Sequence, residues 1–178
     1  TATSYTVPDG VKSIDYRAFS DCTRLISISI PDSVSYIGDR AFYYCTNLTS
    51  VNIPNSVSHI FDLAFAGCGS LSSVTIPNSV ASIREGTFAY CTSLTNVTIP
   101  NGVTSIEVWA FTYCAKLTTI NIPSSVTYIA NQVFSGCISL TNVTIHDRVT
   151  DIGRGAFSAC RRLTSITIPN SVSSIGGY

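Results

Sequence analysis

The chain has 178 residues, enough for one ordinary domain, and its formal net charge is zero with only 11% charged residues. This composition offers no basic surface for nucleic acid, and no run approaches the roughly 18 apolar residues of a membrane span. β-Branched and aromatic residues are plentiful within a hydrophobic fraction of 45%, which argues against disorder. The chain does not begin with Met. We expect residues 1–178 to form a single domain that is a segment of a longer protein.

A unit of 23 residues recurs without insertion or deletion along almost the whole chain. Such a register predicts stacked coils, because one repeat cannot bury its own apolar face and a neighbouring repeat can cover it. Equivalent positions of successive repeats form columns. Three columns hold the same residue in every repeat, and others hold valine or isoleucine. The constant columns are phenylalanine (Phe19, Phe42, Phe65, Phe88, Phe111, Phe134, Phe157), cysteine (Cys22, Cys45, Cys68, Cys91, Cys114, Cys137, Cys160) and leucine (Leu25, Leu48, Leu71, Leu94, Leu117, Leu140, Leu163).

The residues after each leucine have the alternation of a strand. In LTSVNIP, the side chains of Val51 and Ile53 point to one side and the polar residues between them point to the other. Pro54 ends the strand, because it has no N–H to donate to a ladder. Val57 and Ile60 then face inward again. The arc from Val57 to the next phenylalanine is compatible with a second short strand or with a tight helical turn.

The apolar columns also set an expectation for stability. Each coil contributes about seven apolar side chains to a shared core, on the order of 10 kcal/mol gross. The entropy of ordering a whole repeat cancels most of this. Stability is therefore a sum over the interfaces between neighbouring coils. Because the end coils have one neighbour each, we expect them to be the least stable.

The pattern L-x-x-[IV]-x-I-P-x-x-V-x-x-I-x-x-x-A-F-x-x-C resembles the BspA-like class of leucine-rich repeats from about Val7 to Ile175, as in LTSVNIPNSVSHIFDLAFAGC. The resemblance implies a leucine-rich-repeat solenoid, a β-rich right-handed superhelix of about seven to eight stacked coils with a strand row on its concave side. It also implies a surface or secreted module for adhesion and interaction. Three departures, His146 for proline and Thr87 and Val133 for alanine, concern local turns rather than the fold.

The seven cysteines invite a metal or a disulfide interpretation. No C-x-x-C motif occurs, and no histidine lies near a cysteine at ligand spacing, so a zinc site is poorly supported. Stacking brings equivalent positions of adjacent coils within bridging distance, so distance alone leaves disulfides between coils open. The odd number of cysteines and their apolar position favour a ladder of buried free thiols.

Groups suited to catalysis are sparse. His59 and His146 have no serine or cysteine partner in a recognisable motif. Carboxylates gather just before the Ala-Phe pair, close to several arginines, which is typical of one solvated edge. Nothing indicates a cleft where two carboxylates converge, as a glycosidase needs. We expect neither enzyme activity nor a cofactor. The carboxylates are Asp15, Asp39, Asp62, Glu85 and Glu107, and the arginines are Arg17, Arg40, Arg84 and Arg154.

The outward strand positions form two rows of small polar side chains without charge or aromatic rings. One interpretation is a solvated sheet face whose polar groups contact each other across strands. The other is a shallow recognition surface for a protein or a glycan, in which repetition compensates for modest affinity per contact. The mixed identities and the expected curvature disfavour binding to ice or mineral. The candidate binding residues are Ser27, Ser50, Ser73, Asn96, Thr119, Asn142 and Ser165 in one row, and Ser29, Asn52, Thr75, Thr98, Asn121, Thr144 and Thr167 in the other.

Aromatic side chains gather elsewhere and form an alternative interaction strip if they are exposed together. Most flank the phenylalanine and cysteine columns, and two lie in the arc before the isoleucine. They are Tyr43, Tyr44, Tyr90, Trp109 and Tyr113 in the first group, and Tyr36 and Tyr128 in the second.

The sequence thus favours a non-catalytic binding or adhesion module at a cell surface or in the extracellular space, with a protein or glycan as partner. Two alternatives stay open. One is a structural module that associates end to end into a filament through exposed strand edges. The other is the recognition domain of a larger enzyme or receptor. None of these involves nucleic acid or a membrane span within this segment.

Overall fold

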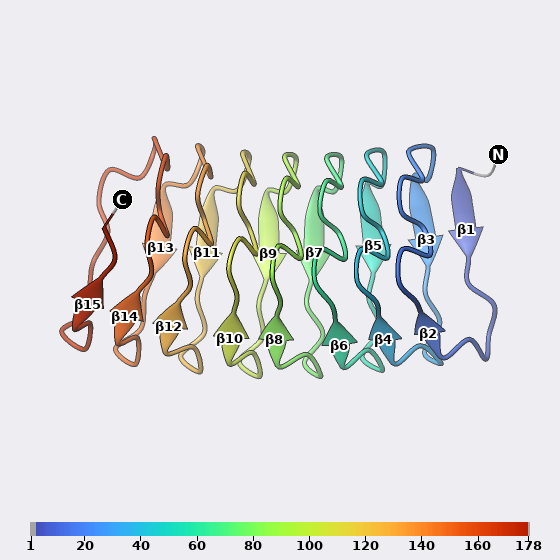
Figure 1. Cartoon of the computed structure of the whole chain (residues 1–178), viewed down its shortest axis with the longest axis horizontal. Coiled ribbons are helices and arrows are strands. Elements are labelled where there is room, and N and C mark those ends of the chain that lie inside the picture. The colour runs from blue at the N-terminus through green and yellow to red at the C-terminus, as the bar shows by residue number, and fades with distance from the viewer. Residues whose placement is uncertain (1–2, 178) are drawn as a thin grey trace.

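The computed structural model describes residues 3–177, which contain short strands and turns but no helix. The strands fall into two rows (Figure 1). The first row holds the three-residue strands β1 (Ser4–Thr6), β3 (Ser27–Ser29), β5 (Ser50–Asn52), β7 (Ser73–Thr75), β9 (Asn96–Thr98), β11 (Thr119–Asn121) and β13 (Asn142–Thr144). The second holds the two-residue strands β2 (Ser13–Ile14), β4 (Tyr36–Ile37), β6 (His59–Ile60), β8 (Ser82–Ile83), β10 (Ser105–Ile106), β12 (Tyr128–Ile129), β14 (Asp151–Ile152) and β15 (Ser174–Ile175).

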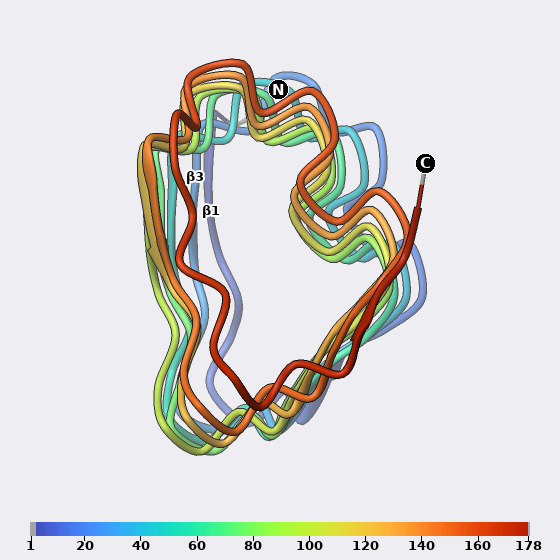
Figure 2. The same cartoon turned by 90° about the vertical axis from the view of Figure 1, so that its left-hand side faces the viewer.

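The chain passes through both rows once per coil, which makes a right-handed β-solenoid of about seven turns (Figures 1 and 2). All strand pairs are parallel, and partners lie one repeat apart: Ile28 faces Val51 and Ile37 faces Ile60. Viewed along the axis, the two rows form different walls of the coil (Figure 2). The strand predicted after each leucine is present in every repeat except the one that begins at Leu163, and the arc that follows contains a second short strand.

The phenylalanine, cysteine and leucine columns lie inside the coils, as the repeat predicted. The rings of the five central phenylalanines are fully buried, and they stack along the axis with centroids 5.1 to 5.8 Å apart and planes within 9° of parallel. Each ring therefore contacts both neighbouring coils, and the core is continuous from coil to coil. These five residues are Phe42, Phe65, Phe88, Phe111 and Phe134.

The segment between each two-residue strand and the next cysteine, here called the Phe turn, consists of tight turns. Around Phe88, alternate amides bond within the segment, such as Thr87 N–H to the Arg84 carbonyl at 3.2 Å. The amides between them bond to the next coil, as Phe88 N–H does to the Ala110 carbonyl at 2.9 Å. In every Phe turn but the last, three N–H groups donate in this way to the following coil. In this coil the other two belong to Gly86 and Tyr90, which donate to Val108 and Thr112.

Two columns of the Phe turn have left-handed backbone conformations. Their non-glycine residues have φ between 52° and 60°, which costs about 1–2 kcal/mol per residue. The cost is offset by the bonds to the next coil that this geometry permits. The first column is Arg17, Arg40, Leu63, Gly86, Trp109, Gln132 and Gly155, and the second is Asp21, Tyr44, Gly67, Tyr90, Tyr113, Gly136 and Ala159.

The strand ladders are interrupted at two junctions, while the Phe-turn ladder is not. Pairing stops between β5 and β7 and between β9 and β11, and the second row stops at the same two coils. Between the coils of β9 and β11, no backbone hydrogen bond among residues 3–177 joins the strand rows. The Phe turns of these coils remain joined, for example by Phe111 N–H to the Val133 carbonyl at 3.0 Å. The backbone hydrogen bonds of this junction are therefore confined to the Phe turn, and the hydroxyl of Ser125 adds one side-chain bond to the carbonyl of Val103.

The departures from the repeat leave the local turns intact. Val149 N–H bonds to the carbonyl of His146 at 3.1 Å, as Val126 N–H does to Pro123 at 3.0 Å, because the turn needs only a carbonyl there. The hydroxyl of Thr87 is buried and donates to the carbonyl of Arg84 at 2.8 Å, which satisfies it.

The last coil is the least covered. Ile175 is 62% exposed, whereas Ile83, at the equivalent position of a central coil, is 2% exposed. Ser165 and Thr167 were expected on a strand, but residues 165–167 form none. The expected weakness of an end coil with one neighbour accounts for both observations.

Candidate functional site

The predicted binding residues lie together on one wall, here called the polar strand face. Along β5, β7, β9, β11 and β13 the two outer residues of each strand are exposed and the middle one is buried. Ser27 is half-buried, and Ser165 and Thr167 are exposed but lie beyond the last strand of this row. The repeat thus aligns these side chains in two columns that run along the solenoid.

The side chains of the polar strand face make none of the side-chain hydrogen bonds found within residues 3–177, so no hydrogen bond links them across strands. Two other columns of hydroxyl side chains, which include Thr95 and Ser35, do form hydrogen bonds between coils. Thr95 donates to the carbonyl of Ser72 at 3.0 Å, and Ser35 donates to that of Lys12 at 3.0 Å, each reaching back one coil. Sequence reasoning missed these columns, although the recurrence of Ser or Thr there was visible. Their hydroxyls hold the coils together, whereas those of the polar strand face are free to meet a partner.

The candidate catalytic groups do not assemble into a site. The Ser58 hydroxyl lies 2.8 Å from Nδ1 of His59, but no hydrogen bond joins this histidine to a carboxylate among the described residues. Arg84 donates to Asp62 at 2.8 Å and lies 5.2 Å from the Phe61 ring centroid. The carboxylates and arginines therefore occupy a solvated edge, with one close ion pair. Within residues 3–177 no group of three or more side chains is arranged to hold a metal ion.

All seven cysteines are free thiols, and six of them are buried. The thiol of each cysteine from Cys45 onward donates to the carbonyl of a phenylalanine one coil earlier; Cys91, for example, lies 3.2 Å from the carbonyl of Phe65. Burial raises the pKa of Cys45 to about 12 and that of Cys160 to about 11. Neutral, buried thiols are poor nucleophiles, so this ladder serves packing rather than chemistry.

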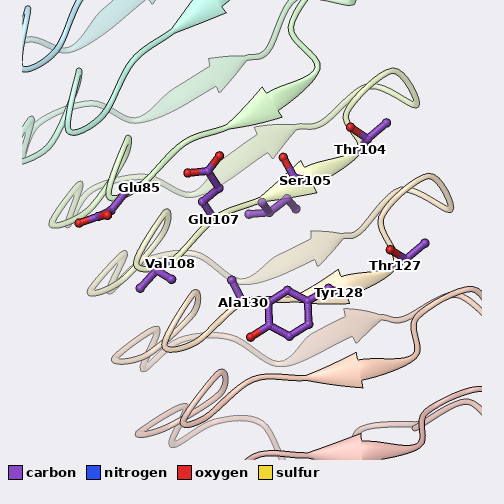
Figure 3. A pocket seen from close by; sticks show the side chains of 9 residues that line it. Glu85, Thr104, Ser105, Glu107, Val108, Thr127, Tyr128 and Ala130 are labelled. Carbon is purple, nitrogen blue, oxygen red and sulfur yellow. The ribbon is translucent and has the colours of Figure 1, made fainter.

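A hollow of about 330 Å³ lies at the open junction between the coils of β10 and β12 (Figure 3). Ser105 donates to Ser82 at 2.7 Å, and Ser82 donates to Glu107 at 2.9 Å, so this carboxylate is held by a chain of hydroxyls. Figure 3 shows Ser105 and Glu107 on one coil and the ring of Tyr128 on the next. The hollow lies where the strand pairing is missing, and two of its polar side chains, Ser105 and Glu107, are already linked through Ser82.

The aromatic residues of the Phe turns line a second hollow of about 410 Å³, here called the aromatic groove. In the end view the backbone of the Phe turns bends inward toward the axis of the solenoid (Figure 2). Trp109 is 43% exposed, Tyr90 49% and Tyr113 51%, so the predicted strip is exposed here. The lining residues are Leu63, Gly86, Ala89, Tyr90, Trp109, Thr112, Tyr113, Gln132 and Ser135.

The sequence matches the model of the family described as BspA type leucine-rich repeat region, in six copies, over residues 1–115 and 59–178. The chain belongs to this family. BspA-type repeats thus account for the whole length of the sequence, and the resemblance on the Leu, Pro, Ala-Phe and Cys columns is confirmed. Among curated protein sequences, no relative of the chain was found.

Solved BspA-type and other leucine-rich-repeat structures resemble the solenoid. A Treponema pallidum leucine-rich-repeat protein (TpLRR) is 31% identical, with a TM-score of 0.81, over 90% of this chain and 78% of that protein. A Bacteroides ovatus leucine-rich-repeat protein is 29% identical, with a TM-score of 0.77, over 97% of this chain and 53% of that one. A Faecalibacterium prausnitzii protein described as a leucine-rich cell surface protein is 31% identical, with a TM-score of 0.66, over 98% and 65%.

Proposed function

We propose that this chain is a non-catalytic binding or adhesion module, located at a cell surface or outside the cell, that binds a protein or a glycan through its polar strand face. Leucine-rich-repeat families are in general non-catalytic and mediate interactions, which supports the proposal. One solved structural neighbour is described as a cell surface protein. Within residues 3–177, no helix is long and apolar enough to cross a bilayer.

The observation that carries the proposal is the state of the polar strand face. Its side chains are exposed at equal intervals, and their hydroxyl and amide groups make no hydrogen bond to any of residues 3–177. Ser73 is aligned with Asn96 and Thr75 with Thr98 on paired strands. An extended partner meets the same groups once per coil, so weak contacts add along its length.

The proposal is tested by screening the chain against immobilised glycans and extracellular-matrix proteins, and repeating each positive result with Ser73→Glu and Thr98→Glu combined. Both side chains are exposed on strands, so the substitutions add charge to the face without disturbing the core. Binding should fall at least tenfold in this variant and stay unchanged in a matched variant carrying Tyr90→Ala and Tyr113→Ala. If every ligand found in the screen still binds the variant with the two glutamates, the proposal for the polar strand face is refuted; a ligand lost only with the two tyrosines binds elsewhere on the chain.

A further inference from the structure

We infer that the aromatic groove is a second binding site and that its ligand is a neutral sugar chain. The inference rests on the proposed function only in treating the chain as a binding module, because the aromatic groove lies on the Phe turns rather than on the polar strand face. None of the residues that line it carries a charge. Its volume of about 410 Å³ lies in the range of small-molecule sites, about 300–1,000 Å³.

The rings on one wall are held in fixed orientations. Tyr90 and Tyr113 stack with centroids 5.2 Å apart and planes 8° from parallel. The ring of Tyr113 lies against Gly136, where a side-chain methyl would come within 2.7 Å of a ring carbon. The glycine thus makes room for the ring, and the face of Tyr113 toward Tyr90 is covered as well. Tyr90 keeps its other face uncovered by any aromatic ring, since its column holds Gly67 in the preceding coil.

The opposite wall combines an aromatic ring with hydrogen-bonding groups. The indole N–H of Trp109 donates to Oε1 of Gln132 at 2.5 Å, which orients the amide and leaves its NH₂ group as a donor. The hydroxyl of Thr112 is buried and donates to the carbonyl of Ser135 at 3.1 Å. Ser135 is half-buried, and its own hydroxyl takes part in none of the side-chain hydrogen bonds found within residues 3–177, so it remains available to a ligand. The groove therefore offers aromatic surface, amide donors and hydroxyl acceptors within one recess.

A neutral sugar matches this combination of groups. A pyranose ring has an apolar face of C–H groups that packs on an aromatic ring, and a rim of hydroxyls that pairs with amides and hydroxyls. An anionic or cationic ligand finds no counter-charge among the lining residues. A hollow of about 280 Å³ shares Trp109 and Gln132 with the aromatic groove and is also lined by Arg154. A chain of more than one sugar that extends past the groove therefore meets a guanidinium, whose N–H groups can donate to its hydroxyls.

The single tryptophan of the sequence makes the inference directly measurable. Trp109 is 43% exposed, so a sugar packed on it shifts its fluorescence to shorter wavelength and protects it from acrylamide quenching. The chain is titrated with cellohexaose, maltohexaose and mannohexaose to about 10 mM, a range that covers weak binding. A heparin hexasaccharide and an uncharged proline-rich peptide serve as comparison ligands. We expect at least one neutral hexasaccharide, and neither comparison ligand, to change the signal.

Two variants locate the ligand. Tyr90→Ala with Tyr113→Ala should weaken the binding about threefold to tenfold while Trp109 continues to report it. Tyr128→Ala, which removes an exposed ring outside the groove, should leave it unchanged. No response to the neutral sugars, or a response only to heparin or the peptide, overturns the inference. Because Ser73→Glu and Thr98→Glu leave the groove intact, sugar binding that persists in that variant separates this site from the polar strand face.

Discussion

The thiol of Cys91 donates a hydrogen bond to the backbone carbonyl of Phe65, one coil earlier, at 3.2 Å. The same carbonyl also accepts the amide N–H of Cys68 at 3.2 Å. A cysteine in this column thus fills an apolar space and binds the preceding coil at the same time. This explains why a small residue with a weak donor suits the column better than alanine or valine.

Replacing Cys91 by alanine should lower the free energy of unfolding by about 1–2 kcal/mol, from lost burial and a lost hydrogen bond. Urea denaturation followed by circular dichroism measures the change. Cys22→Ala is the matched control, because Cys22 lies in the first coil and is only half-buried. Equal losses in the two variants would show that the contact with Phe65 contributes nothing.

The buried thiols predict alkaline instability. Below about pH 9, the ordinary pKa of these thiols, both folded and unfolded chains keep them protonated. As the pH rises above 9, the unfolded chain loses thiol protons while burial keeps the pKa of Cys45 at about 12 and of Cys160 at about 11 in the folded chain. The free energy of unfolding should therefore fall across this window.

Urea denaturation at a series of pH values from neutral to about pH 10.5 measures this slope. Burial also holds the pKa values of Cys91 and Cys114 well above the ordinary value. Replacing both by valine should make the slope shallower, because two of the thiols that lose protons only in the unfolded chain are removed. An unchanged slope in the double variant would assign the alkaline loss to other groups.

The phenylalanine stack predicts that a central ring contributes more than a terminal one. Phe88 is fully buried between Phe65 and Phe111, each 5.6 Å away, so Phe88→Ala should cost about 3–5 kcal/mol. Phe157 is half-buried and stacks on Phe134 alone. Phe157→Ala should cost clearly less in the same thermal or urea denaturation. Similar losses at both positions would contradict a core shared between neighbouring coils.

The left-handed columns predict a position where glycine is tolerated or even stabilising. Ala159 has φ of 55° and is exposed. Ala159→Gly relieves strain of about 1–2 kcal/mol against an unfolded-state entropy cost of about 0.4–1 kcal/mol, for a gain of up to about 1 kcal/mol. Ala81 is also exposed but is not among the residues with positive φ. Ala81→Gly should therefore lose about 0.5–1 kcal/mol, and a matching loss at Ala159 would refute the strain argument.

The main features of the fold could be predicted from the sequence because the columns are invariant. Cys91, Phe88 and Leu94 repeat at one spacing, and each is fully buried. The strand that contains Val74 follows from its alternation with polar neighbours. These inferences need only two periods: the alternation of side chains along a strand and the repeat length of the solenoid. Together they determine which side chains face the core.

The Phe turn could not be predicted in the same way. Its left-handed residues include Trp109 and Gln132, whose identities favour ordinary φ, and only the glycines at positions such as 86 and 155 hint at the conformation. The aromatic groove depends on that conformation. The sequence therefore placed Tyr90 and Trp109 in one aromatic strip but did not indicate that they line a groove. The interrupted ladder between β9 and β11 has no signature either, because the repeat there keeps its spacing.

The backbone hydrogen bonds that join one Phe turn to the next all have one direction: Phe65 N–H donates to Thr87, Phe88 to Ala110 and Phe111 to Val133, always toward the later coil. Parallel peptide dipoles add, so this edge has an electric polarity whose positive pole faces the C-terminal coil. An α-helix has the opposite sense, with its positive pole at the N-terminus. The peptide dipoles at this edge therefore add as they do in a helix, but with the opposite sense and from residues of successive coils. A charged partner lying along the axis meets a field that distinguishes its two orientations.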